Sequence, residues 1–142
     1  LKRTIEVRGA DAQTAPLACA LPALWTGILY DERALAEADA VTADFTYDEV
    51  SALRDQVWER GLRSVWRGAP LLILAERVLE IAEGGLERRG FESSKGDDER
   101  VHLKRLKELV SRGQSPADAL VEALAGKDFV AEVIARADLG DG

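Results

Sequence analysis

The stretch PLLILAERVLEIAEGGLERR, residues 70–89, decides the fold class. Its apolar side chains recur every three or four residues, and charged side chains fill the positions between them. The apolar positions are Leu71, Leu74, Ala75, Val78, Leu79, Ala82 and Leu86, and the charged ones are Glu76, Arg77, Glu80, Glu83, Glu87 and Arg88. This spacing is that of an amphipathic helix with one face toward a core and the other toward solvent. It therefore predicts packing rather than chemistry for this segment.

Helix start and stop signals predict further helices on both sides of this stretch. Asp31, Thr46 and Ser115 are good N-cap residues, and Glu49, three residues after Thr46, completes a capping box. Glycines follow the helical patterns at positions 61, 113 and 126, where helices commonly end. The expected helices cover residues 15–30, 32–43, 46–60, 70–89, 98–112, 115–125 and 127–137. We therefore expect a mainly α protein with at least five helices.

The first of these helices is almost wholly apolar, with the sequence APLACALPALWTGILY at residues 15–30. A segment that is apolar on all sides is normally buried in a core or an interface. Pro22 lies inside it, and an interior proline removes a helical hydrogen bond, so we expect a kink or a break there. Cys19 has no His or Lys beside it in this run that would activate the thiol, and we interpret it as a small core residue.

The N-terminal stretch TIEVRGAD, residues 4–11, is typical of a short strand. Thr4, Glu6 and Arg8 would project from one face of it, because alternate side chains share a face in a strand. A surface ion pair between Glu6 and Arg8 explains this pattern, and so does a site that needs a carboxylate and a guanidinium. No partner strand is evident elsewhere, and a lone strand is not stable. We therefore expect the chain to be part of a longer protein; a complete small domain with a frayed N-terminal arm is the alternative.

Composition excludes several classes of protein. The 142 residues carry a net charge of −7 with Lys and Arg interleaved with acids, which is unsuited to binding nucleic acid. One cysteine allows neither an internal disulfide nor a cysteine-built metal site. No apolar run is long enough to span a membrane, and no signal-peptide pattern is present. We expect a cytoplasmic location.

Few other residues suggest chemistry. His102, the one histidine, falls beside Leu106 and Leu109 on the apolar side of its expected helix, and we interpret it as a packed core residue. The acidic residues 97–99 are interpreted as a solvated helix start rather than a metal site. The three tryptophans are expected to be core or interface anchors; they are Trp25, Trp58 and Trp66.

Several motifs resemble those of the glutamate–cysteine ligases, in the branch shared by plants and many proteobacteria. Residues 6–11 match a family strand that ends in Glu-x-Arg-Gly-Ala-Asp. Residues 21–25 match its Leu-Pro-Ala-Leu/Phe-Trp run, and residues 27–31 match its Gly-(Leu/Ile)-Leu-Tyr-Asp. Residues 61–90 resemble its long helix, and residues 102–120 its closing segment. The resemblance covers nearly the whole chain.

The resemblance implies an enzyme that joins the side-chain carboxylate of glutamate to the amine of cysteine, using ATP and Mg²⁺, in the first step of glutathione synthesis. The carboxylate is phosphorylated, and the cysteine amine then attacks the acyl phosphate. Arg8 and Glu6 inherit a place in or beside the active site: Arg8 would hold a substrate carboxylate or phosphoryl oxygens, and Glu6 would orient the strand or assist a cation. Thr4 stands at a substrate-binding position where many members have an aromatic residue, and this departure puts a cysteine-contacting role in doubt.

The resemblance also implies a fold. The family's catalytic sheet is glutamine-synthetase-like, and most of its metal and nucleotide ligands lie upstream of the residues present here. The 142 residues would be one C-terminal helical region, with a strand and turn over residues 1–13 and helices over 14–142. We expect it to bind no metal or ATP and to be inactive alone, and to self-associate through residues 1–30. The alternative is an independent acidic helical module for interaction or assembly.

Overall fold

The computed structural model describes residues 6–7, 10, 13–92, 94, 96–126, 128, 130–131 and 134. Within them the protein is mainly helical, which confirms the predicted fold class. The α-helices are α1 (Ala15–Leu29), α2 (Glu32–Thr42), α3 (Tyr47–Arg60), α4 (Leu71–Arg89), α5 (Lys104–Ser111) and α6 (Pro116–Leu124). The shorter elements are two 3₁₀ turns, η1 (Gly61–Arg63) and η2 (Glu99–Leu103), and two strands, β1 (Val65–Trp66) and β2 (Ala69–Pro70).

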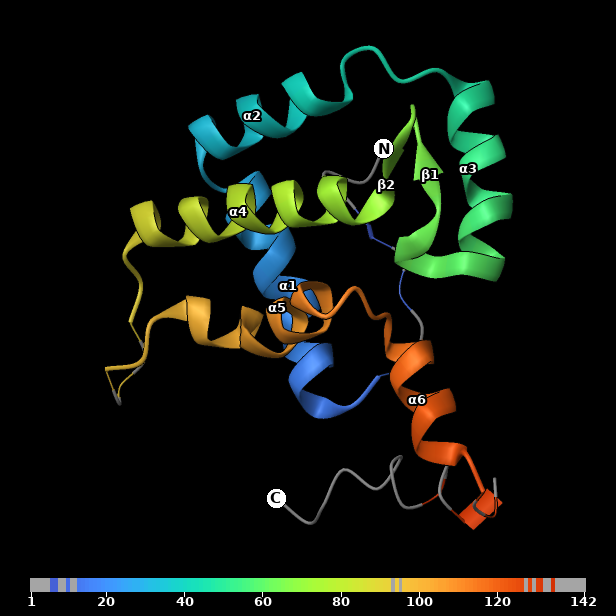
Figure 1. Ribbon diagram of the computed structural model, residues 1–142. Coiled ribbons are helices and arrows are strands. Elements are labelled where there is room, and N and C mark those ends of the chain that lie inside the picture. The colour runs from blue at the N-terminus through green and yellow to red at the C-terminus, as the bar shows by residue number, and fades with distance from the viewer. Residues whose placement is uncertain are drawn as a thin grey trace.

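The core lies where α1 crosses α4. Figure 1 shows α4 between α2 on one side and α5 on the other, with α1 crossing beneath it, and all three of these helices contact α4. The buried core residues are Ala23, Ile28, Ala34, Ile81, Ala82, Leu86 and Leu103. The apolar face predicted for residues 70–89 is thus the face that α4 buries, because Leu79, Ala82 and Leu86 all point into this core.

Small residues set the distance between α1 and α4. A Cβ built on Gly27 would lie 2.8 Å from the carbonyl carbon of Ala82, and one built on Gly85 would lie 2.8 Å from the carbonyl carbon of Gly27. Real Cβ atoms do not approach other atoms so closely. The two helices therefore pack backbone against backbone at this crossing, and glycine is required on both sides.

The predicted N-caps are confirmed. The Asp31 carboxylate accepts a hydrogen bond from the backbone N–H of Ala34, at 2.7 Å. Thr46 and Glu49 form the expected capping box at the start of α3. Ser115 caps α6 through a second capping box, whose other member is Asp118. These signals are local in sequence, and the structure uses each of them where it was expected.

Three expectations about secondary structure need correction or lie partly outside the described residues. Pro22 does not break the first helix, since α1 is continuous from Ala15 to Leu29. Ala18, whose carbonyl Pro22 leaves without a helical partner, is exposed, so that solvent can reach that oxygen. Of the expected N-terminal strand, Glu6 and Val7 are not in a strand, and the rest lies outside the described residues. Of the helix expected over 127–137, residues 130, 131 and 134 are helical, and most others lie outside the described residues.

A small hairpin that the sequence did not predict connects α3 to α4. Its strands pair antiparallel, with Trp66 opposite Ala69, and Arg67 and Gly68 form the turn with positive φ angles of 49° and 83°. Positive φ at both central residues is the geometry of the tight hairpin turns that match strand twist. Each strand has only two residues, too few for an alternating pattern to be recognised. The hairpin therefore corrects the expectation of helices throughout residues 14–142.

Arg67 fastens this hairpin to the start of α3. Its Nε and Nη2 atoms donate to the Glu49 carboxylate at 2.9 and 2.8 Å, and Nη1 donates to the Asp44 carboxylate at 2.7 Å. The guanidinium also lies 5.4 Å from the ring centroid of Phe45 and 5.3 Å from that of Trp66. These contacts raise the pKa of Arg67 and lower the pKa of Glu49 to about 2, through the hydrogen bonds between them first. One side chain therefore holds three separate segments together.

Candidate functional site

Only one of the three predicted site residues lies in the described part of the chain. Glu6 is exposed and outside regular secondary structure, and it makes an interaction with a neighbouring group. Thr4 and Arg8 lie outside the described residues. The segment leads into α1, whose N-cap is Thr14 in an extended conformation. Since Glu6 is not in a strand here, the predicted strand face is not observed, and the roles of Thr4, Glu6 and Arg8 stay predictions.

A groove of about 420 Å³ opens beside the first turns of α1. It lies between α1 and the η2–α5 segment, and its lining is Ala15, Pro16, Cys19, Val101, His102, Lys104, Arg105 and Glu108. Cys19 and His102 are both exposed in it, so their assignment to the core was wrong. Its walls are mostly apolar, while Arg105 is neutralised by Glu108 at 3.0 Å. The groove is thus suited to an apolar group rather than to a reaction centre.

Backbone geometry explains why His102 and Cys19 are exposed rather than buried in the core. His102 lies in η2, a 3₁₀ turn, where residues advance by about 120° rather than about 100°. This difference rotates His102 outward and places Leu103, which is 0% exposed, in the core. On α1 the buried positions are Ala20, Ala23, Gly27 and Ile28, because these face the close crossing with α4. Cys19 lies outside that face.

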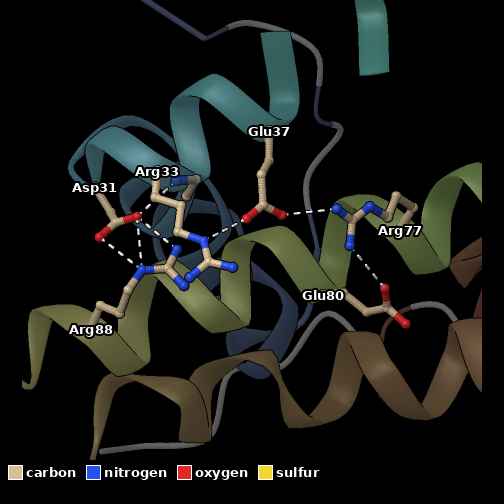
Figure 2. A network of polar contacts seen from close by, with 7 residues as sticks. Asp31, Arg33, Glu37, Arg77, Glu80 and Arg88 are labelled. Atoms are coloured by element: carbon tan, nitrogen blue, oxygen red, sulfur yellow. Dashed lines mark hydrogen bonds and ion pairs between the residues drawn. The ribbon is translucent and has the colours of Figure 1, made fainter. Parts of the chain in front are cut away.

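A charged network fastens α2 to α4 (Figure 2). The Arg88 Nη2 and Nε atoms donate to the Asp31 carboxylate at 2.7 and 3.1 Å. Together with the hydrogen bond from the backbone N–H of Ala34, these bonds lower the pKa of Asp31 to about 2, the Arg88 bond being the largest cause. Asp31 thus both caps the N-terminus of α2 and forms the ion pair that connects α2 to Arg88 of α4.

The network continues along the same two helices. Glu37 accepts from Arg33 at 3.0 Å on α2 and from Arg77 at 2.8 Å across to α4, and Arg77 also donates to Glu80 at 3.3 Å. These contacts lower the pKa of Glu37, the Arg33 hydrogen bond most. Each guanidinium drawn here already has a carboxylate partner. The network is therefore a structural clamp, and its side chains are not arranged around a ligand.

The described residues offer no metal site, since no group of three or more His, Cys, Asp or Glu side chains among them could hold an ion. The acidic run at 97–99 begins η2 instead. The Asp98 carboxylate accepts from the backbone N–H of Arg100 at 2.7 Å and from its Nε at 2.8 Å. The first of these bonds contributes most to lowering the pKa of Asp98. The interpretation of this run as a helix start is confirmed.

Comparison with known proteins gives the family. The model for glutamate–cysteine ligase family 2 matches residues 1–137 of this chain. The chain belongs to this family. Its relatives include the chloroplastic glutamate–cysteine ligases of Medicago truncatula, 45% identical over 127 residues, and of Solanum lycopersicum, 42% identical over 127 residues. That of Arabidopsis thaliana is 41% identical over the same length. These alignments cover 89% of this chain.

This glutamate–cysteine ligase family member spans only about a quarter of its relatives, whose alignments cover 24%, 23% and 23% of their lengths. The resemblance seen in the sequence motifs is thereby confirmed. The described residues do not fit a Mg²⁺ site, because no group of their side chains could hold the ion and several of their carboxylates already pair with arginines. These carboxylates are Asp31, Glu37, Glu49, Asp98 and Asp118. In the described part of the chain, no helix is long and apolar enough to cross a membrane.

Sequence reasoning missed the two arginines that organise this part of the ligase family fold. Arg67 and Arg88 each bind partners far away in sequence, Glu49 at 18 residues and Asp31 at 57 residues. No local spacing signals such pairs. It also left open whether Trp58 is a core or an interface residue, and the structure places this side chain at 92% exposure on α3.

Proposed function

We propose that this chain is the C-terminal part of an ATP-dependent glutamate–cysteine ligase, the enzyme of the first step of glutathione biosynthesis. The observation that carries this proposal is the family match over residues 1–137, together with 45% identity to a named glutamate–cysteine ligase. In the whole enzyme, glutamate, cysteine and ATP would be the substrates and Mg²⁺ the cofactor.

Arg8 and Glu6 are the residues through which this chain would reach the reaction. A guanidinium binds a carboxylate or a phosphoryl group with two parallel hydrogen bonds, so Arg8 would fix one of these groups of the substrate. Glu6 would orient the segment or assist a cation. Thr4, which would lie on the same face, would contact substrate more weakly than the aromatic residue common at this position.

The remaining residues would form a scaffold that holds this segment in place. Several of their charged side chains are engaged in helix caps and interhelical ion pairs such as Asp31–Arg88. Fixing a reactive group in position is itself a large part of catalysis, because misplacement of about 1 Å can lower a rate about a hundredfold. The scaffold alone would have no ligase activity, because most of the family's metal and nucleotide ligands would lie upstream of these residues.

The test measures ADP release and γ-glutamylcysteine formation with glutamate, cysteine, ATP and Mg²⁺. We expect no cysteine-dependent turnover by the 142-residue chain and normal turnover by the longer polypeptide that carries it. Robust turnover by the pure 142-residue chain would overturn the proposal that the chain depends on upstream residues. A longer polypeptide that forms no product would overturn the proposed function and favour an independent interaction module.

The location is a separate proposal. A cytoplasmic location is the proposal from the sequence. An organelle is the alternative, because the relatives named above are chloroplastic. Fusing a fluorescent protein to the C-terminus of the longer polypeptide, in cells of the source organism, would distinguish cytoplasm from an organelle.

A further inference from the structure

The outward face of α3 carries four large apolar side chains and one arginine. We call this set the α3 stripe, and its members are Tyr47, Val50, Arg54, Val57 and Trp58. Tyr47 is 84% exposed, Val50 46%, Val57 37% and Trp58 92%. At about 100° per residue all five fall within roughly 100° of arc, which makes a single face. A neighbouring face of the helix holds the half-buried Glu49, Leu53 and Gln56, and Glu49 on it binds Arg67 of the hairpin.

The position of α3 leaves this face uncovered by the described residues. Figure 1 shows α3 at the edge of the molecule beside the hairpin, away from α1 and α5. It contacts η1 and β1, and none of its residues is buried. A solvated helix normally carries polar groups on its outer face. The α3 stripe reverses that pattern.

A groove of about 450 Å³ continues the stripe toward α6. Val57 and Trp58 line its α3 side, and Val121, which is 68% exposed, lines its α6 side. The Arg63–Asp118 ion pair, at 2.7 Å, ties the two sides together. The groove therefore carries Val57, Trp58 and Val121 as apolar positions, while most of its remaining lining is polar, including Glu59, Arg60, Gln114 and Glu122.

We propose that the α3 stripe is the surface by which this chain docks on the rest of its own ligase polypeptide. The inference rests on the proposed function, because the occupant is the part of the ligase that this chain lacks. The chain spans about a quarter of its relatives, so in the proposed ligase a large partner surface would belong to the same molecule. Trp, Tyr and Arg are the residue types that dominate protein-interface energetics, and the stripe holds one of each.

The α3 stripe is too small to bind a second, separate copy of the chain stably. A helix of 14 residues is about 21 Å long, and its two aromatic side chains present roughly 300 to 500 Å². A stable complex between separate proteins typically buries about 800 Å² on each partner. Docking within one polypeptide needs less area, because the tether supplies an effective concentration in about the millimolar range.

The experiment measures the rate at which hydroxyl radicals oxidise Trp58, read by mass spectrometry. In the longer ligase we expect oxidation of Trp58 at least about tenfold slower than in the dilute 142-residue chain, because interface anchors are fully desolvated. Phe91, 60% exposed at the opposite end of α4 and outside the stripe, is the internal reference and is expected to react alike in both. Equal oxidation of Trp58 in both proteins would overturn the proposal, as would protection that appears in the short chain as its concentration rises, which would indicate a second copy.

A pair of variants of the longer ligase tests the same surface without relying on the folding of the short chain. Trp58→Glu is expected to lower the melting temperature of the longer ligase and to expose α3 to hydrogen exchange. Phe91→Glu, the matched control, is expected to change neither. Equal effects of the two variants would contradict docking. Formation of γ-glutamylcysteine is measured in parallel. If the longer ligase makes product while Trp58 is oxidised freely, the docking proposal is wrong and the proposed function stands. If Trp58 is protected but no product forms, the proposed function is wrong and docking stands.

Discussion

Gly27 on α1 and Gly85 on α4 lie against each other so closely that neither position has room for a side chain. A Cβ on Gly85 would meet the Gly27 carbonyl and, at 3.0 Å, the Cβ of Ala34. All of these neighbours are backbone atoms or a buried methyl group, which cannot move aside. The distance between these two helices, whose crossing forms the core, thus requires glycine at both positions.

Gly85→Ala is therefore expected to destabilise the protein by at least about 1–3 kcal/mol, the usual cost of overpacking a core. Urea unfolding followed by circular dichroism measures the change. Gly84→Ala is the matched control, because a Cβ there meets no backbone atom and only the Arg88 guanidinium, at 3.2 Å. Alanine is favoured over glycine within a helix by about 1 kcal/mol, which offsets a small shift of that guanidinium, so this variant should be destabilised much less than Gly85→Ala. Equal destabilisation by both variants would refute the close crossing.

The lowered pKa of Asp31 predicts that the stability of the fold decreases at acidic pH. Its pKa falls from 3.8 to about 2 in the folded chain, through the hydrogen bonds from Arg88 and Ala34. A lowered folded pKa means that the carboxylate stabilises the fold at pH values above 3.8, and that this stabilisation disappears as the pH falls toward about 2. Asp31→Asn keeps a capping oxygen but cannot titrate. The difference in unfolding free energy between wild type and variant should therefore shrink between about pH 4 and 2. A difference that is the same at both ends of this range would contradict the Asp31–Arg88 pair.

Two variants at Arg67 separate its two roles, which are the ion pairs with Glu49 and Asp44 and the positive φ angle in the hairpin turn. Arg67→Gly removes the clamp on Glu49 and Asp44 but suits the positive φ of 49°, whereas Arg67→Ala removes the clamp and keeps a side chain in the left-handed region. The expected order of stability is wild type, then Arg67→Gly, then Arg67→Ala. Hydrogen exchange of the Leu71 amide, which donates to the Ser64 carbonyl across the hairpin at 2.8 Å, reports the loosening. Alanine more stable than glycine here would contradict the observed turn.

Much of the fold could be predicted because its signals are local. Caps such as Asp31 and Ser115 act within three or four residues, and the apolar spacing of residues 70–89 marks its own buried face. The errors come from tertiary effects. His102 was placed by assuming α-helical rotation where the chain makes a 3₁₀ turn, and the hairpin around Arg67 depends on partners 18 and 23 residues away. The candidate site was inferred from family motifs, because no spacing within residues 4–8 distinguishes an active-site strand from a surface ion pair.

Self-association through residues 1–30 stays a prediction, and its test needs a substitution that leaves the core intact. Leu24 packs against the core, so Leu24→Asp would disturb folding as well as any interface. Ala18 is exposed on the same helix and is the better position. We expect light scattering across a concentration series to show a dimer or larger species for the 142-residue chain, and Ala18→Glu to shift it toward monomer. A wild-type monomer at high concentration would contradict the prediction.

The central claim is that this chain contributes Arg8 to the active site of a glutamate–cysteine ligase. The most direct measurement is cysteine-dependent γ-glutamylcysteine formation by the longer ligase carrying Arg8→Lys, beside Arg33→Lys as the control. Arg33 is 74% exposed and pairs with Glu37 one turn away, so its replacement should leave the rate unchanged. Lysine keeps the charge at position 8 but loses the two-pronged grip, and we expect the rate to fall on the order of a hundredfold or more. A rate for Arg8→Lys equal to that of the control would contradict the account.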